Sequence, residues 1–191
     1  MGGPDVAARE ELIQLVKEKA LRFGDFTLTS GRKSHYYIDA KQVTLDPQGA
    51  RLIGEAILDL LEATWGLPDA VGGMAVGADP ITGAIVTMAG IRGKPVLGFL
   101  VRREAKGHGT QRFLEGPVVP GQKAVIVEDV ITTGGSALAA ASRAKEFGLN
   151  VVGVIGIIDR LEGGREAIAA AGLPCQALLT IRDLGIEPAS A

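Results

Sequence analysis

Apolar residues recur at helical spacing in two stretches near the start of the chain. The first covers residues 5–23 and ends at Gly24, which predicts a helix. In the second, Asp46 can cap a helix, Pro47 suits its first position, and an apolar face follows. The residues between these helices, 26–43, are rich in Thr, Ser and Tyr, so we expect short strands or a hairpin there.

Farther along the chain, apolar strands alternate with helices. This alternation predicts a single α/β domain whose mostly parallel sheet is covered by helices on both faces. In such sheets, ligands bind at the carboxyl ends of the strands, where the connecting loops gather. We expect Asp79 to cap the helix that follows the first of these strands. The expected strands are residues 69–75, 95–101, 124–128, 150–158 and 175–181, and the expected helices are residues 80–89, 135–147 and 164–171.

The composition fits one folded domain and argues against several classes of protein. The chain has 191 residues, of which 47% are hydrophobic and 22% charged, and its formal net charge is -2. This balance is typical of a folded protein with its own core, and it argues against a nucleic-acid partner. Because Cys175 is the only cysteine, we expect neither an intrachain disulfide nor a thiolate zinc site.

One stretch, residues 70–91, is apolar enough to resemble a membrane span. It contains Asp79-Pro80 and several glycines, which favour a strand, a turn and a helix instead. No basic segment followed by an apolar run opens the sequence, so no signal peptide is expected. We therefore expect a cytoplasmic protein without a membrane partner.

The strongest chemical signal is VIVEDVITTGGSA, residues 125–137. Glu128 and Asp129 come where an apolar strand leaves the sheet. Adjacent carboxylates can accept hydrogen bonds from vicinal hydroxyls, such as those of a ribose, or hold a hard cation. The loop after them offers hydroxyl groups and backbone N–H groups at a helix start, which suits a phosphate. A plain strand–turn–helix junction is the alternative, and the acidic pair directly before the loop favours a sugar and a phosphate.

This stretch resembles the phosphoribosyl-pyrophosphate (PRPP) signature of the type I phosphoribosyltransferases. The resemblance implies their α/β fold, with a small hood formed mainly by residues 1–45 plus the C-terminal end, and a core over about residues 46–172. It also implies that Glu128 and Asp129 hold the ribose hydroxyls. The further residues implied to bind PRPP, mainly at its 5'-phosphate, are Val130, Ile131, Thr132, Thr133, Gly134, Gly135 and Ser136.

A second segment narrows the resemblance. Residues 23–43, FGDFTLTSGRKSHYYIDAKQV, are similar to the hood of the orotate phosphoribosyltransferases. By this resemblance, Ser30 and Gly31 approach orotate through their backbone, and Tyr36 and Tyr37 lie against its flat ring. The alternative is that the two tyrosines only pack within a hairpin and do not contact a ligand. Thr29 departs from the pattern, because many relatives have lysine at that position.

The long connection after the strand at residues 95–101 is also informative. Its window RREAKGHGTQR, residues 102–112, contains four Lys or Arg residues, one His and one Glu. It resembles the mobile catalytic loop of the same enzymes, which reaches into the neighbouring subunit and so implies a homodimer. A solvated basic surface is the alternative. The resemblance assigns PRPP binding to Arg102, Arg103, Lys106 and His108, and catalysis to Arg103, Lys106 and His108.

Two further segments bear on the ligands. Asp159-Arg160 ends a very apolar strand, and an arginine there can bind a planar carboxylate through two parallel hydrogen bonds. The resemblance makes Arg160 an orotate contact with Thr132 nearby; a strand-end Asp–Arg ion pair is the alternative. Many bacterial relatives have a pyrophosphate-binding lysine in the segment that corresponds to residues 76–78. This chain has Val-Gly-Ala there, so we expect backbone N–H groups to bind the pyrophosphate instead.

Together these segments imply transfer of the phosphoribosyl group from PRPP to orotate, giving orotidine 5'-monophosphate and pyrophosphate. The implied cofactor is Mg²⁺, held mainly by PRPP with water-mediated help from Glu128 and Asp129. A phosphoribosyltransferase for a purine or another base is one alternative, and a PRPP-sensing regulator without catalysis is another. Retention of Lys106 and His108 argues against the regulator.

Overall fold

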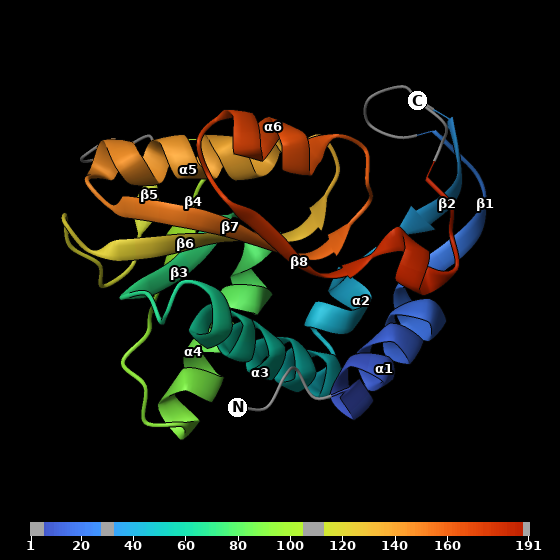
Figure 1. Cartoon of the computed structure of the whole chain (residues 1–191), viewed down its shortest axis with the longest axis horizontal. Coiled ribbons are helices and arrows are strands. Elements are labelled where there is room, and N and C mark those ends of the chain that lie inside the picture. The colour runs from blue at the N-terminus through green and yellow to red at the C-terminus, as the bar shows by residue number, and fades with distance from the viewer. Residues whose placement is uncertain (1–5, 28–32, 105–112, 189–191) are drawn as a thin grey trace.

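A six-stranded sheet forms the centre of the molecule (Figure 1). The computed structural model describes residues 6–27, 33–104 and 113–188. Strands β4, β3, β6, β7 and β8 are mutually parallel neighbours, whereas the edge strand β5 runs antiparallel to β4, so the sheet is mostly parallel as predicted. The strands are β3 (Ala70–Met74), β4 (Leu97–Val101), β5 (Leu114–Glu115), β6 (Lys123–Ile131), β7 (Asn150–Asp159) and β8 (Cys175–Thr180).

Helices cover both faces of this sheet. Figure 1 shows α3 (Pro47–Thr64) and α4 (Ala78–Ile91) on one face, and α5 (Gly135–Phe147) and α6 (Gly164–Ala170) on the other. The side chains of β6 alternate between the two apolar layers: Val125 and Val127 pack on the α3–α4 side, and Ile126 packs on the α5–α6 side.

The N-terminal elements differ from the single long helix that the sequence predicts. Helix α1 (Val6–Leu15) passes through the π-helical turn η1 (Val16–Ala20), and strand β1 (Leu21–Thr27) begins directly after it. Strand β1 pairs antiparallel with β2 (Lys33–Ile38), and α2 (Lys41–Thr44) follows. The helical spacing was misleading beyond η1, because pairing with β2 draws the last residues of the expected helix into a strand. Phe23 consequently lies opposite Tyr36 and is 72% exposed.

Three element ends bear on the site or on stability. Asp46 caps α3 as predicted, since its carboxylate accepts from the backbone N–H groups of Gln48 and Gly49. Helix α4 begins at Ala78 with Gly77 in the N-cap position, so Asp79 lies in the first turn and is not the cap. Strand β6 continues past the predicted end, because β7 keeps pairing with it up to Ile131.

The last described element is the short 3-10 helix η2 (Ile181–Leu184), which follows β8. Asp183 of η2 pairs with Arg9 of α1 at 2.7 Å, so the end of the described chain is tied to its beginning. Among the helices of the described ranges, none combines the length and the apolar composition that crossing a membrane requires.

Candidate functional site

Strand β6 brings its two carboxyl groups together at its end, where a hydrogen bond between the Glu128 and Asp129 side chains contributes to the raised pKa of Glu128. Glu128 is 6% exposed, and Asp129 is partly buried. The Asp129 carboxylate lies against Gly77, because a Cβ atom at that position would come within 2.9 Å of it. Asp129 also accepts a hydrogen bond from the backbone N–H of Val130 at 2.8 Å. The two acids therefore lie next to each other at the strand end, with Asp129 also beside the loop that contains Gly77.

Glu128 is buried and incompletely bonded. Burial first, and then the adjacent Asp129 carboxylate, raise the pKa of Glu128 to about 8. Its Oε2 atom has no hydrogen-bond partner among the described residues. Buried polar atoms are normally satisfied, so an unpaired carboxylate oxygen at the ligand edge of the sheet suits a hydroxyl donor from outside the protein.

The loop between β6 and α5 forms a small cavity next to Glu128. Its volume is about 50 Å³. Gly134 is the N-cap of α5 with φ 81°, so the helix start and its free N–H groups face this loop. Backbone N–H groups at a helix N-terminus stabilise an anion such as phosphate. The residues lining the cavity are Glu128, Val130, Ile131, Thr132, Thr133, Gly134, Gly135, Ser136 and Ala137.

The start of α6 supports this loop from behind. A Cβ atom on Gly164 would lie 2.4 Å from the carbonyl oxygen of Thr132 and 3.0 Å from the backbone N of Gly134. A Cβ atom on Gly134 would in turn meet the carbonyl oxygen of Gly164 at 2.9 Å. Glycine at both positions lets the two backbones touch, and this contact holds the loop in its curved shape.

Arg160 lies beside the same loop. Its backbone N–H donates to the carbonyl oxygen of Ile131 at 2.9 Å, and its side chain is buried with 5% exposed. The guanidinium carbon stands 4.6 Å from the centre of the Tyr36 ring. Its Nε atom lies 2.8 Å from a Glu162 carboxylate oxygen, as an ion pair without hydrogen-bond geometry. The fold thus brings together two predicted orotate contacts, Arg160 directly after β7 and Tyr36 of the β1–β2 hairpin.

The ion pair that was the alternative for Asp159-Arg160 is not formed. Asp159 is 1% exposed and accepts from the backbone N–H of Leu161 at 2.8 Å. Its other oxygen lies 3.6 Å from Nε of Arg165. Arg160 is thus held by Glu162 and the Tyr36 ring, not by its neighbour in sequence.

The two tyrosines of β2 point in opposite directions. Tyr36 is partly buried and faces Arg160, whereas Tyr37 is 43% exposed and its ring centre lies 5.6 Å from that of Phe26. Successive residues of a strand face opposite sides, so the structure brings only Tyr36 to the arginine. The predicted contacts Ser30 and Gly31 lie outside the described residues, as does Thr29.

The start of the long connection reaches the acidic end of β6. Nε of Arg103 approaches the carbonyl oxygen of Ala75 at 3.4 Å, and its charge acts against the rise in the pKa of Glu128. Arg102 pairs instead with Glu115 on β5. The predicted catalytic residues Lys106 and His108 lie outside the described residues.

One cation near the site went unnoticed in the sequence. Burial opposes the charge on Lys41, but its pairing with Asp39 at 3.2 Å, with smaller contributions from Asp129 and Tyr37, raises the pKa of Lys41. Asp129 therefore has a lysine in its surroundings that comes from α2, far away in the sequence. No motif marks Lys41, because its proximity to Asp129 arises only when the hairpin folds against the sheet.

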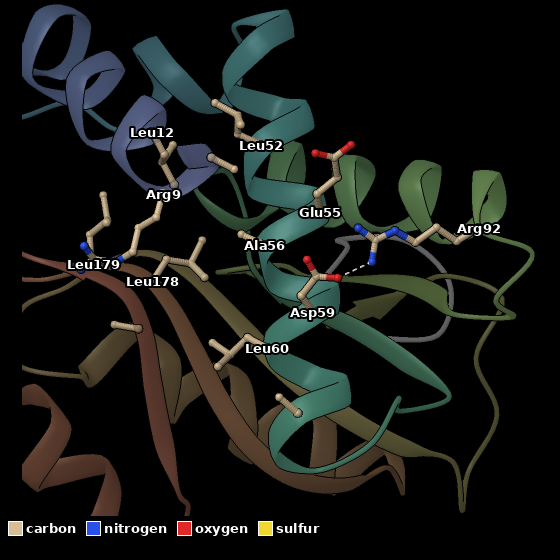
Figure 2. Close-up of a pocket in the computed structure, with 13 residues that line it drawn as sticks. Arg9, Leu12, Leu52, Glu55, Ala56, Asp59, Leu60, Arg92, Leu178 and Leu179 are labelled. Carbon is tan, nitrogen blue, oxygen red and sulfur yellow. Dashed lines mark hydrogen bonds and ion pairs between the residues drawn. The ribbon is translucent and has the colours of Figure 1, made fainter. Parts of the chain in front are cut away.

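A much larger groove lies away from these residues. It measures about 550 Å³ between α1, α3 and β8, and Figure 2 shows leucines from all three elements facing it. Its charged rim is already paired, since Arg92 binds Asp59 at 2.5 Å. None of the predicted site residues lines it. Size alone would therefore point to a different part of the molecule.

Comparisons with known proteins define the class first. Residues 39–171 match the family model of the phosphoribosyl transferase domain. The chain is 56% identical to the orotate phosphoribosyltransferase of Rhodopirellula baltica, over 93% of this chain and 94% of that protein. The orotate phosphoribosyltransferase of Mycobacterium tuberculosis, solved with Fe(III) dicitrate, superposes with a TM-score of 0.83 at 42% identity, over 94% of this chain and 99% of that one.

A second crystal structure of the Mycobacterium tuberculosis enzyme, in complex with PRPP, superposes with a TM-score of 0.78 at 37% identity, over 94% of this chain and 99% of that one. The chain is thus a phosphoribosyltransferase with the fold that the sequence predicted. Within that class it belongs to the orotate phosphoribosyltransferase family, as the resemblance of its hood segment and PRPP signature implied.

Proposed function

We propose that the protein catalyses Mg²⁺-dependent transfer of the phosphoribosyl group from PRPP to orotate, releasing pyrophosphate and forming orotidine 5'-monophosphate. The observation that carries the proposal is the meeting of three groups at the carboxyl ends of β6 and β7. These are the acidic pair Glu128–Asp129, the small cavity under the start of α5, and Arg160 stacked on Tyr36. They suit a ribose, a phosphate and a planar carboxylate respectively.

The chain's contribution is mainly to position and to neutralise charge. Glu128 has a free oxygen for a ribose hydroxyl, and Asp129 beside it takes the second. Thr132 to Ser136 hold the 5'-phosphate through hydroxyl and N–H groups. Arg160 binds the orotate carboxylate, with Thr132 close by and Tyr36 beside the guanidinium. The base nitrogen then attacks C1 of the ribose while the pyrophosphate leaves.

The leaving group carries several negative charges, so it needs cations. Arg102 and Arg103, together with Lys106, are proposed to neutralise it, and His108 to donate a hydrogen bond or a proton. The segment at residues 76–78 has no side-chain cation, so the N–H groups at the start of α4 are proposed to assist. Lys41, whose pKa is affected by the nearby Asp129, adds a positive charge to the same region.

The residues present fit a metal that is held mainly by the substrate. Glu128 and Asp129 offer carboxylate oxygens, but within the described ranges no three His, Cys, Asp or Glu side chains gather as a metal site. Substrate oxygens must therefore supply most ligands, with the two acids helping through water. Bound Mg²⁺ would neutralise charge on the pyrophosphate and hold it against the ribose. We place the reaction in the cytoplasm, where a single free Cys175 is compatible with a reducing environment.

An absorbance assay tests the reaction directly. Protein, PRPP and Mg²⁺ mixed with orotate should consume the orotate absorbance and yield orotidine 5'-monophosphate. Adenine, hypoxanthine and uracil in place of orotate should give no nucleotide, and excess chelator should stop the reaction. Transfer to a purine with no transfer to orotate would show that the acceptor is wrong. PRPP binding without transfer to any base would favour the sensing role.

We further propose a homodimer in which Lys106 of one subunit serves the site that contains Arg160 of the other. Lys106→Ala and Arg160→Ala variants should each be nearly inactive alone. Mixed in equal amounts and allowed to exchange subunits, they should regain about a quarter of wild-type activity, because random pairing makes half of the dimers mixed, each with one intact site. No recovery, with exchange shown by mass, would place Lys106 in its own subunit's site.

A further inference from the structure

Arg143 on α5 binds the backbone where the chain leaves β4. Its Nη1 group donates to the carbonyl oxygen of Arg102, and its Nη2 group donates to that of Arg103 at 2.9 Å. Nη1 also lies 3.9 Å from the sulfur of Met74 at the end of β3. One guanidinium group therefore spans two successive carbonyl groups just beyond the sheet.

The same side chain contacts the returning end of the connection. Its guanidinium carbon lies 4.2 Å from the centre of the Phe113 ring. The backbone N–H of Arg102 donates to the carbonyl oxygen of Phe113 at 2.7 Å, so the outgoing and returning chains are bonded to each other at this point. Arg143 thus contacts both ends of the connection and fixes them to the rigid helix α5.

Fixing these carbonyl groups also fixes the direction of the Arg103 side chain. Arg103 is exposed, yet its Nε atom approaches the carbonyl oxygen of Ala75 and its charge reaches Glu128. A long exposed side chain loses much rotamer freedom when it is held in one place. A backbone held by Arg143 reduces that loss, because only the side-chain torsions of Arg103 remain to be ordered.

We propose that Arg143 is a positioning residue for the phosphoribosyl transfer, acting through Arg103 without touching either substrate. The inference rests on the proposed function, since it uses the role of Arg103 beside the leaving pyrophosphate. An arginine is required rather than any cation: its planar fork matches two neighbouring carbonyl oxygens and its face stacks on Phe113, whereas a lysine supplies one point charge.

The first test compares Arg143→Met with wild-type protein in steady-state kinetics. The value of kcat should fall about tenfold, while the KM for orotate and the melting temperature stay the same, because a displaced catalytic group costs rate without loss of orotate contacts. Arg143→Lys should recover only part of the loss. Lys145→Met, an exposed change two residues along the same helix, should leave kcat unchanged.

A double-mutant cycle separates positioning of Arg103 from a general effect on the fold. In an Arg103→Ala background, Arg143→Met should reduce kcat by less than about twofold, since its target is already gone. The inference is overturned if Arg143→Met has wild-type kcat, or if it costs the same tenfold factor in both backgrounds. Neither result touches the proposed function, which fails only if the wild-type protein does not transfer the phosphoribosyl group to orotate.

Discussion

Replacing Arg160 by alanine is expected to weaken orotate binding by about 2–5 kcal/mol, because the carboxylate of orotate loses its partner in a buried setting. Arg160 is 5% exposed, stacked on Tyr36 and paired with Glu162, so its head group is already ordered before ligand arrives. The change also leaves Glu162 without this partner. Titration calorimetry with orotate, in the presence of pyrophosphate and Mg²⁺, gives the difference in free energy of binding.

Two further variants make the Arg160 result specific. Arg160→Lys keeps the charge and should restore part of the affinity, whereas loss of fold would remove binding in both variants. Arg165→Ala removes a half-exposed arginine of α6 that pairs with Asp159, and it should leave orotate affinity within about 0.5 kcal/mol of wild type. Unchanged affinity in Arg160→Ala would place the carboxylate of orotate elsewhere and would reassign this arginine to a structural role.

Replacing Glu128 by glutamine is expected to change how stability depends on pH. Burial, and then Asp129, raise the pKa of Glu128 to about 8, well above its ordinary value of 4.5. Between these two values the folded protein retains a proton that the unfolded chain has lost. Stability therefore falls as pH rises from about 4.5 to about 8, and it levels off above that. This carboxyl group destabilises the fold at alkaline pH by up to about 5 kcal/mol.

Chemical denaturation from pH 6 to pH 9 measures this effect. The wild-type free energy of unfolding should decline over the range relative to that of Glu128→Gln, which cannot ionise at this position. The difference between the two proteins should be largest at the alkaline end. A constant difference across the range would show that Glu128 keeps its charge in the folded protein, and that its unpaired oxygen is solvated.

The affinity for PRPP should increase with pH, whereas the stability of the fold decreases. A ribose hydroxyl donates to a carboxylate more strongly than to a neutral carboxyl group, so binding favours the ionised form of Glu128. Wild-type affinity for PRPP should therefore increase as pH rises towards about 8. Glu128→Gln should bind more weakly and without this dependence, and it serves as the control for the titration of PRPP itself.

Much of the fold followed from local patterns in the sequence. The helices at residues 47–64 and 135–147 have clear boundaries, a proline after a capping Asp46 in one and glycines at both ends of the other. Apolar runs that alternate with helical segments indicated the five parallel strands. The N-terminal helix was predicted too long, because spacing alone does not reveal the pairing of β1 with β2. The extension of β6 to Ile131 was missed for a similar reason, since it depends on β7.

Part of the candidate site can be predicted from contiguous residues, and the rest depends on contacts between residues that are distant in the sequence. Glu128, Asp129 and the loop after them are contiguous, so a motif can identify them. Arg143 and Lys41 act through partners far away in sequence, and their surroundings are ordinary: an alanine-rich helix for one and the end of a hairpin for the other. The sequence alone does not distinguish the roles of Tyr36 and Tyr37. Their environments differ because successive side chains of the pleated strand β2 point to opposite sides.

The backbone N–H of Arg160 donates a hydrogen bond to the carbonyl oxygen of Ile131, and this bond couples the two proposed ligand sites. It joins the arginine proposed for the acceptor to the strand that leads into the loop proposed for the donor. A donor that fixes this loop also fixes the backbone that carries Arg160. Each substrate should then raise the affinity for the other by the same factor, as thermodynamic linkage requires. A filled donor site would in this way prepare the protein for orotate.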